Sequence, residues 1–184
     1  MGRTRELKQQ LRRQCIFPGD HRTVWMMKLS AHESYDIYRF LFHLRRYEYL
    51  LTCRTTVLTK IRRFWHLRQY QIFAKGLGYV IGDGVLGENV TFYHRGSIYI
   101  NPAARVGPDC KFHGDCCIGV ARTGETGCPV LGRGVDVGIG ARVLGDIYIA
   151  DGIVIGANSV VTKSFHEPGI TIAGIPARKI GGEK

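Results

Sequence analysis

Apolar residues recur every six positions through the second half of the chain. One register runs through Leu131, Val137, Val143, Ile149, Ile155 and Val161, a second through Ile100, Val106, Phe112 and Ile118, and a third pair is Leu86 and Phe92. An α-helix repeats at about 3.6 residues and a simple strand at about two, so a period of six indicates a repeat architecture.

A second set of mostly small or aliphatic residues stands four positions after most of these anchors, and so two before the next anchor. Its members are Val90, Ala104, Cys110, Cys116, Val135, Ala141, Ile147, Ile153 and Ser159. Residues two apart in a strand point to the same side, so each six-residue unit supplies two inward side chains and a turn. Three units make a triangular coil, and stacked coils bury a continuous core. The repeat therefore predicts a mainly β fold, a parallel β-helix over residues 78–184.

Two other architectures do not fit this pattern. A β-sandwich shows longer alternating strands, with turn signals every 8 to 12 residues or so. A membrane-spanning helix needs about 20 consecutive apolar residues, and the sequence has no such run.

The residues ahead of the repeats, 1–77, form a basic region whose pattern is helical. Residues 1–75 hold 16 Lys and Arg against 5 Asp and Glu, whereas residues 76–184 hold 10 of each, so the net charge of +11 lies ahead of the repeats. The stretch Ser30–Glu33 predicts a capping box that starts a helix ending at about Leu51, and a second helix is expected over about 55–74. Gly76 and Gly78 mark the expected domain boundary.

Three interpretations of this basic region stay open. It is a helical cap over the strand edges of the first coil, or a cap that also contacts an anionic membrane surface or a lipid-linked glycan, or a solvated charged face. No nucleic-acid-binding motif is present, so no nucleic-acid partner is expected.

The cysteines and the first residues of the chain indicate the cellular compartment in which the protein is expected. Cys110 and Cys116 hold inward positions, where a thiol acts as a small apolar group, and Cys15 and Cys53 lie in the basic region. No pair has C-x-x-C spacing, so neither a disulfide framework nor a metal site is expected. The start, MGRTRELKQQLRRQC, is polar and basic and does not resemble a secretory signal. A cytoplasmic protein is predicted, with peripheral contact at the inner face of the membrane as an extension.

The six-residue register breaks twice. The step from Phe92 to Ile100 is eight residues and contains His94, and the step from Ile118 to Leu131 is thirteen, which predicts an excursion loop over about 119–130. Breaks in a rigid repeat are where function tends to be placed, and an imidazole on such a scaffold suits a general base. The alternative for a single histidine is a surface or structural role.

From about residue 78 to 180 the chain resembles the hexapeptide-repeat acyltransferases, and among them the serine acetyltransferases and their relatives that O-acetylate bacterial glycans. The resemblance is carried by Phe92-Tyr93-His94 with the repeat resuming at Ile100, and by the closing segment IGANSVVTKSFHEPGITIAGIPARKI. It implies a left-handed parallel β-helix with an N-terminal α-helical cap. It also implies acetyl-CoA as donor, no metal, and homotrimers with active sites between neighbouring β-helices.

The resemblance also assigns roles to residues. His94 falls on the family's catalytic histidine, and His113, one coil away, is a second candidate for a polar contact in catalysis. The residues expected near CoA are Ile139, Ala157, Thr162, Lys163 and Arg178. The residues expected near the acceptor are Tyr93, Arg95, Arg122 and Cys128.

The chain departs from the serine acetyltransferases at three places. Tyr93 and Tyr79 stand where the family has Asp, and Gly127-Cys128-Pro129 stands where the family has an Arg-His-Pro triplet whose Arg meets the carboxylate of serine. A buried carboxylate without a partner is costly, which weakens free serine as acceptor.

These departures order the functional hypotheses. The main one is acetyl-CoA-dependent O-acetylation of a sugar hydroxyl in surface-polysaccharide biosynthesis. The alternative is serine O-acetylation in cysteine biosynthesis, and a third is a non-catalytic trimeric scaffold or a nucleic-acid binder.

Overall fold

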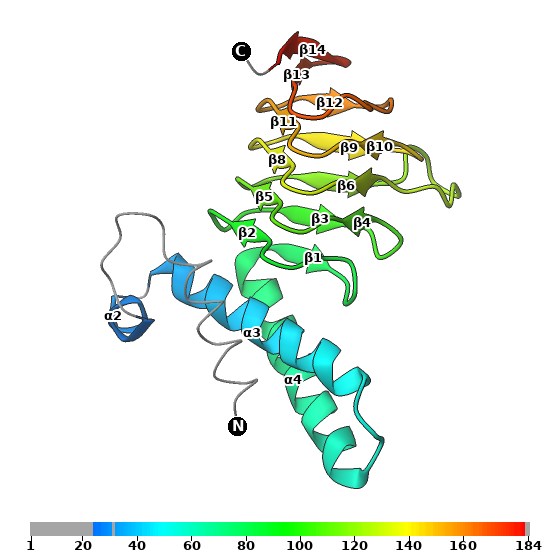
Figure 1. Cartoon of the computed structure of the whole chain (residues 1–184). Coiled ribbons are helices and arrows are strands. Elements are labelled where there is room, and N and C mark those ends of the chain that lie inside the picture. Colours follow the sequence, from blue (N-terminus) through cyan, green and yellow to red (C-terminus); the bar gives the residue numbers. More distant parts are fainter. Residues whose placement is uncertain (1–23, 31, 183–184) are drawn as a thin grey trace. The chain divides into compact units, whose positions relative to one another are not determined.

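The computed structural model describes residues 24–30 and 32–182. The chain divides into two compact units, Met1–Gly78 and Tyr79–Lys184, which are described separately below (Figure 1). Cys15 lies outside the described residues.

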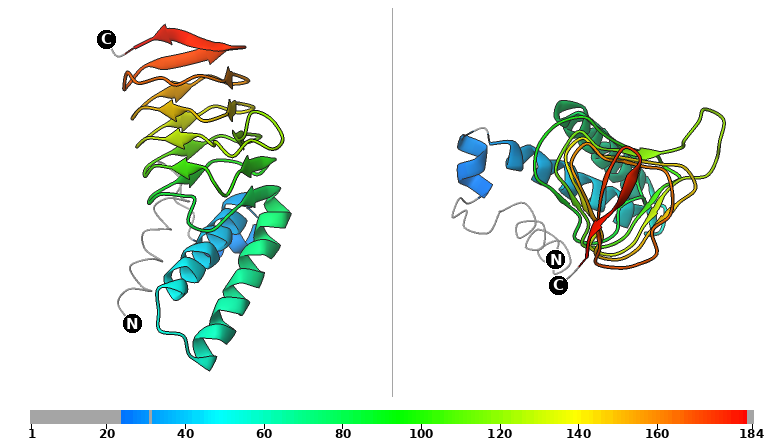
Figure 2. Two further views of the ribbon diagram at one scale, coloured as in Figure 1. Left: turned by 90° about the vertical axis from the view of Figure 1, so that its right-hand side faces the viewer. Right: turned by 90° about the horizontal axis from the view of Figure 1, so that it is seen from above.

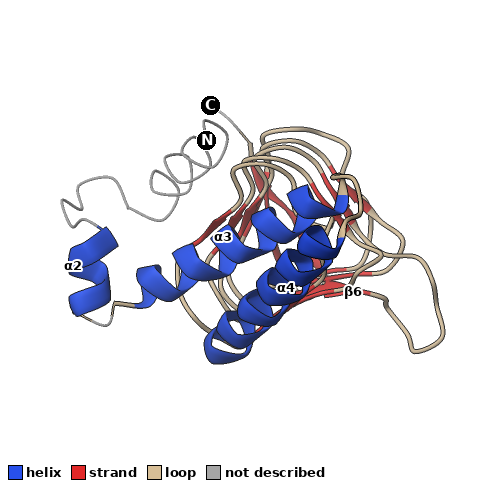
Figure 3. Cartoon of the chain, turned by 90° about the horizontal axis from the view of Figure 1, so that it is seen from below, coloured by secondary structure: helices blue, strands red, loops and turns tan. Residues whose placement is uncertain are grey.

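The first unit is helical. Its described elements are α2 (Val24–Leu29), α3 (Glu33–Leu51) and α4 (Val57–Leu77). The two long helices lie side by side (Figure 3). Their shared core is formed by Ile37, Phe40, Leu41 and Leu44 of α3 with Tyr70, Ala74 and Leu77 of α4. No helix among residues 24–30 and 32–182 is long and apolar enough to cross a membrane.

The helix boundaries correct one prediction and support another. The N-cap of α3 is His32, whose ring accepts a hydrogen bond from the N–H of Ser34, so the predicted capping box is wrong. Ser30 Oγ donates instead to the carbonyl of Met27 and closes the end of α2, a short helix that the apolar pattern did not reveal. α4 begins after Thr56 and ends at Gly78, which adopts the left-handed conformation (φ 82°) that glycine reaches without a steric penalty.

The second unit is a parallel β-helix of three sheets (Figure 1). Sheet A contains β1 (Tyr79–Ile81), β3 (Ile98–Ile100), β6 (Cys117–Gly119), β9 (Arg142–Leu144) and β12 (Val160–Val161). Sheet B contains β4 (Arg105–Val106), β7 (Val130–Leu131) and β10 (Tyr148–Ile149). Sheet C contains β2 (Thr91–Phe92), β5 (Lys111–Phe112), β8 (Asp136–Val137), β11 (Val154–Ile155), β13 (Thr171–Gly174) and β14 (Ala177–Gly181).

The register of the sheets follows the six-residue anchors. Phe92 pairs with Phe112, Phe112 with Val137, and Val137 with Ile155, all in parallel strands. Every anchor and every companion position predicted from the repeat is buried. The polar member of the set, Ser159, accepts a hydrogen bond from the N–H of Gly174 at 3.2 Å. The predicted β-helix fold is therefore confirmed.

Three edges join the sheets, and each edge is named here by the sheets that it connects. The C–A edge consists of the turns 93–97, 113–116, 138–141 and 156–159. The A–B edge consists of the turns 82–85, 101–104, 120–129, 145–147 and 162–164. The B–C edge consists of the turns 87–90, 107–110, 132–135, 150–153 and 166–170. The first break widens one turn of the C–A edge, and the second forms the loop 120–129, which projects from the triangular coil in Figure 2.

Five cysteines belong to the part of the chain that the structure describes. Cys53, Cys110, Cys116, Cys117 and Cys128 are free thiols in the part of the chain that the structure describes. Cys110 and Cys116 are buried at inward positions, as predicted. Burial raises the pKa of Cys110 to about 11, which keeps this thiol protonated and apolar in character.

A histidine pair lies inside the helical unit. The Nδ1 atoms of His43 and His66 are 3.0 Å apart, and an Arg39 guanidinium nitrogen lies 3.2 Å from His43 Nε2. Arginine only donates, so His43 Nε2 is the acceptor and His43 Nδ1–H donates to His66. Burial, with Arg39, lowers the pKa of His43 from 6.5 to about 4. Burial, with Arg46, lowers the pKa of His66 to the same value.

This pair predicts a loss of stability in mild acid. The unfolded chain takes up these protons near pH 6.5 and the folded unit only near pH 4, so stability is complete above pH 6.5 and falls as the pH drops toward 4. The two imidazoles together contribute on the order of a few kcal/mol to this loss. Both tryptophans, Trp25 and Trp65, belong to the helical unit, so their fluorescence during urea unfolding measures this unit alone. The variant His43→Gln/His66→Gln should flatten the pH dependence, and an unchanged slope would contradict this explanation.

Candidate active site

Successive turns of the C–A edge carry several of the predicted site residues. His94 lies in the widened turn between β2 and β3, His113 and Gly114 begin the next turn, and Ile139 and Ala157 follow in the two turns beyond. Backbone hydrogen bonds hold the turns in a stack: Gly140 N–H donates to the Gly114 carbonyl at 3.1 Å, and Asn158 N–H to the Ile139 carbonyl at 2.8 Å. The edge therefore presents these residues on a rigid support.

His94 is exposed, and its backbone is fixed from inside the coil. The hydroxyl of Tyr79 donates to the His94 carbonyl at 2.8 Å, while the Tyr79 ring is buried against Phe92 with 5.1 Å between ring centroids. Gly114 lies beside His94 in the next coil, where an added Cβ would stand 3.9 Å from the Cβ of His94. Tyr79, at a position where the family has Asp, thus holds the main chain of His94.

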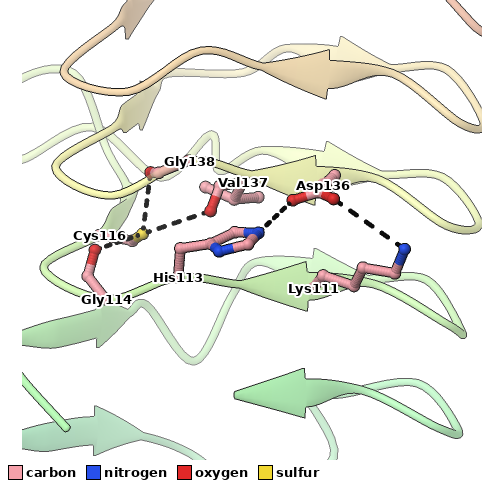
Figure 4. Close-up of polar contacts among 7 residues, drawn as sticks. All are labelled: Lys111, His113, Gly114, Cys116, Asp136, Val137 and Gly138. Atoms are coloured by element: carbon pink, nitrogen blue, oxygen red, sulfur yellow. Dashed lines mark hydrogen bonds and ion pairs between the residues drawn. The ribbon is translucent and has the colours of Figure 1, made fainter. Parts of the chain in front are cut away.

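His113, on the coil next to that of His94, forms a hydrogen bond with Asp136 of the following coil (Figure 4). His113 Nε2 is 2.8 Å from Asp136 Oδ1, and the other carboxylate oxygen is 4.0 Å from Lys111 Nζ. A carboxylate only accepts, so His113 Nε2 carries hydrogen, and in the neutral ring Nδ1 is left as the basic nitrogen. The Tyr93 ring stacks on the His113 ring at 4.5 Å and an angle of 6°.

Asp136 was missed from the sequence, although the repeat contains a signal for it. Asp136 pairs in register with Lys111 on the neighbouring strand, and both stand one residue before a buried anchor. Outward positions in register therefore place opposite charges beside each other. A comparison of outward residues between coils would have found the Lys111–Asp136 pair before the structure did.

The remaining predicted residues lie at other places. Thr162 and Lys163 stand on the A–B edge with the loop 120–129, which carries exposed Arg122 and buried Cys128, and Lys163 Nζ lies 5.4 Å from the centre of the Phe165 ring. Arg178 is an exposed residue of β14 and pairs with Ala173 at the end of sheet C. Arg95 is exposed and follows His94 on the C–A edge.

Cys128 is a poor candidate for a nucleophile. The residue is 7% exposed, and burial raises the pKa of its thiol, with the negative charge of Asp146 adding to the effect. The thiolate is the reactive form of cysteine, and both influences disfavour it. Gly127 approaches Asp146 so closely that an added Cβ would meet the Asp146 Cβ at 2.5 Å, so this part of the loop is packed against the coil.

Sheet A separates the predicted site residues of the C–A edge from those of the A–B edge within one chain. His94, Ile139 and Ala157 stand on the C–A edge, whereas Thr162 and Lys163 stand on the A–B edge, and the strands of sheet A run between the two edges. The predicted CoA-binding set is therefore not brought together by a single copy. Among residues 24–30 and 32–182, no group of three or more His, Cys, Asp or Glu side chains is arranged to hold a metal ion.

A groove on the B–C edge is a separate feature. It has a volume of about 520 Å³ and is lined by Asp109, Arg133, Gly134, Asp151, Gly152, Pro168 and Gly169. Arg133 is already paired with Asp109 at 2.5 Å, and its N–H donates to Asp151. These charges satisfy one another, and the groove lies on a different edge from His94.

Comparison with known proteins relates the chain to serine acetyltransferases. The serine acetyltransferase of Buchnera aphidicola subsp. Schizaphis graminum is 28% identical over 162 residues, covering 85% of this chain and 55% of the relative. The solved serine acetyltransferase of Vibrio cholerae O1 biovar El Tor N16961 superposes with a TM-score of 0.69 at 21% identity, over 98% of this chain and 67% of that one. A serine acetyltransferase solved in complex with CoA gives a TM-score of 0.65 at 22% identity, over 95% of this chain and 66% of that one. No protein-family model matches the chain.

These matches make the chain serine acetyltransferase-like in sequence and in fold. The likeness to the solved structures concerns the fold, which includes an N-terminal helical region as well as the three-sheet β-helix. The chain spans about half the length of the curated relative described above. These relatives are serine acetyltransferases, and they do not support the glycan-modifying branch of the resemblance.

Proposed function

We propose that this serine acetyltransferase-like chain transfers the acetyl group of acetyl-CoA to an alcohol hydroxyl, with His94 as the general base. The observation that carries the proposal is the position of His94 in the single widened turn of the C–A edge, next to the Asp136–His113 pair. The complex of a structurally similar serine acetyltransferase with CoA supports the donor.

The chemistry needs one proton transfer and one acyl transfer. The neutral imidazole of His94 takes the proton of the acceptor hydroxyl as its oxygen attacks the thioester carbonyl. Backbone N–H groups near the loop 120–129 are the proposed donors to the resulting oxyanion. The intermediate then expels the CoA thiolate, which takes the proton from the imidazolium. The products are an O-acetyl ester and free CoA, and His94 returns to its neutral form.

The separation of the two edges supports an assembly in which neighbouring copies share each site. In a threefold homo-oligomer, the C–A edge of one copy meets the A–B edge of the next, and Ile139 and Ala157 then face Thr162 and Lys163 of the neighbour across one CoA groove. Cyclic closure of this kind is common among homo-oligomers.

Mixing of variants tests the shared site. We expect His94→Ala and Thr162→Ala/Lys163→Ala each to lose most activity alone. After co-refolding in equal amounts, about three quarters of the trimers are mixed, and one of the three sites in each mixed trimer combines two intact edges. Activity should therefore return to about a quarter of the parent's. A mixture with no more activity than the average of its two parents would show that each copy carries a complete site.

Serine is the acceptor that the relatives favour, since the named relatives are serine acetyltransferases. Recognition of free serine requires a positive group for its carboxylate. Arg95, exposed beside His94, and Arg122, exposed on the loop, are the candidates for this contact.

A sugar hydroxyl is the second candidate acceptor, and one observation favours it. Gly127-Cys128-Pro129 replaces the Arg-His-Pro triplet of the family, and Cys128 is buried. The usual carboxylate anchor is therefore missing, which suits a neutral acceptor whose hydroxyls need only hydrogen bonds.

The acceptor is tested by following the release of the CoA thiol with serine and with a panel of sugars. Alanine, which matches serine but has no hydroxyl, is the control for hydrolysis. Thiol release with serine but not with alanine or sugars would support serine as the acceptor. Thiol release with a sugar but not with serine or alanine would support the glycan acceptor. CoA binding without thiol release in the presence of any hydroxyl compound would overturn the proposal in favour of a scaffold.

The variant Tyr79→Phe tests how His94 is positioned. It removes the hydrogen bond to the His94 carbonyl and keeps the ring packed on Phe92. We expect a loss of about 1 kcal/mol in stability and a decrease in kcat of about tenfold, because small displacements of a catalytic group are costly. KM for acetyl-CoA should change little. A purely structural role for Tyr79 predicts the same loss of stability with kcat unchanged.

A further inference from the structure

Helix α4 presents an apolar stripe to solvent. The α4 stripe consists of Val57, Leu58, Ile61, Phe64, Trp65 and Ile72, whose exposed fractions range from 48% to 77%. These residues are spaced so that they fall on one side of a helix. Concentrated exposure of large apolar side chains is typical of an interaction surface.

The stripe is not needed to hold α4 in its unit. The buried residues of α4 are His66, Tyr70, Ala74 and Leu77, which belong to its other side. Arg63 lies on the same side as these buried residues and donates to the carbonyls of Leu50 and Cys53. The packing of the unit therefore accounts for one face of α4 and leaves the stripe unexplained.

The charges on α4 are all positive. The helix contains Lys60, Arg62, Arg63, Arg68 and Lys75 and no Asp or Glu, and the run without acidic residues extends over 49–82. Lys60, Arg62, Arg68 and Lys75 are exposed. Arg68 and Lys75 fall within the stripe, and Lys60 and Arg62 lie on either side of it on the helix surface.

This combination identifies the partner by its chemistry. Aromatic and aliphatic side chains bordered by lysine and arginine match the boundary between acyl chains and anionic headgroups of a bilayer. A second copy of the same face would bring the four exposed basic residues of each helix together without a carboxylate from either α4. α4 is not apolar enough to cross a membrane, so a contact with a bilayer would run along its surface.

We infer that the helical unit binds anionic membrane surfaces through the α4 stripe and its flanking basic residues. Phe64 and Trp65 enter the headgroup region, and Lys60, Arg62 and Arg68 contact lipid phosphates. The inference is independent of acetyl transfer, because binding to vesicles is measured without acetyl-CoA.

Flotation of the full chain with vesicles tests the inference. Vesicles of phosphatidylglycerol and phosphatidylcholine in equal parts should carry the protein, and vesicles of phosphatidylcholine alone should not. Leu58→Ser/Ile61→Ser/Phe64→Ser should weaken binding by at least about tenfold. Lys60→Gln/Arg62→Gln/Arg68→Gln should weaken it by about fivefold per charge, and added salt should have the same effect on the parent.

The matched control for vesicle binding is a substitution of an exposed apolar residue in the other unit. Ile180→Ser changes a residue of β14 that is 68% exposed in the other unit, and it should leave vesicle binding unchanged. Equal binding by the parent and the α4 stripe variant would overturn the inference. A smaller assembly of the stripe variant in light scattering, with no vesicle binding by the parent, would also overturn it and would assign the stripe to a second copy.

Discussion

Replacing His94 by alanine is expected to lower turnover by about two to four orders of magnitude, the usual range for loss of an acid–base group. Without the imidazole, no group at the widened turn takes the acceptor proton as the oxygen attacks. Since Ile139, Ala157 and Lys163 lie in other turns, the affinity for CoA should stay close to that of the parent. Single-turnover rates and calorimetric titration with CoA measure the two quantities separately.

His166→Ala is the matched control for this experiment. His166 is an exposed histidine of the same unit on the B–C edge, stacked on Tyr148 with 5.7 Å between ring centroids. Its replacement should leave turnover within about twofold of the parent, since it is remote from the C–A edge. Turnover of His94→Ala close to that of His166→Ala would contradict the role assigned to His94.

Replacing Phe112 by alanine is expected to cost about 3–5 kcal/mol in the free energy of unfolding. Phe112 is fully buried, and its ring stacks on Phe92 with 5.4 Å between centroids. Its strand is paired on both sides, with β2 and β8, so the coil cannot collapse into the space left by the ring. Denaturant unfolding followed by far-ultraviolet circular dichroism measures the loss.

Two further variants on the same strand provide the comparison for the loss of unfolding free energy in Phe112→Ala. Phe112→Leu keeps most of the apolar volume and should cost clearly less than Phe112→Ala. Lys111→Ala changes the outward neighbour, which is exposed and lies 4.0 Å from Asp136, and should cost at most about 1 kcal/mol. Equal losses for Lys111→Ala and Phe112→Ala would show that the inward register is not what stabilises the coil.

The β-helix could be predicted because each six-residue unit shows, in its own sequence, which positions point inward. Phe112 and Ile118 are inward for the same local reason as Ile149 and Ile155, so neighbouring units support one another. The helical unit offers no such redundancy. Ser30 and His32 are both able to cap a helix, and the choice between them depends on α2, whose exposed Trp25 and Met26 give no clear period.

The candidate site was predictable where a break in the repeat marked it. The widened turn indicated His94 as a residue with a special role, but neither the hydrogen bond from Tyr79 nor the Asp136–His113 pair is visible along the sequence. Both contacts join different coils, 15 and 23 residues apart, so they depend on the stacking register. The separation of Ala157 from Lys163 by sheet A likewise follows only from the three-sheet topology.

The most direct test of acetyl transfer is the fate of a labelled acetyl group. Acetyl-CoA labelled in the acetyl carbon is incubated with the protein and the best hydroxyl acceptor, and the label is measured in the acceptor, the protein and water. We expect an O-acetyl ester on the acceptor, no label on the protein, and no ester with His94→Ala. Label held on Cys128, or ester formation that continues without His94, would contradict direct transfer with His94 as the general base.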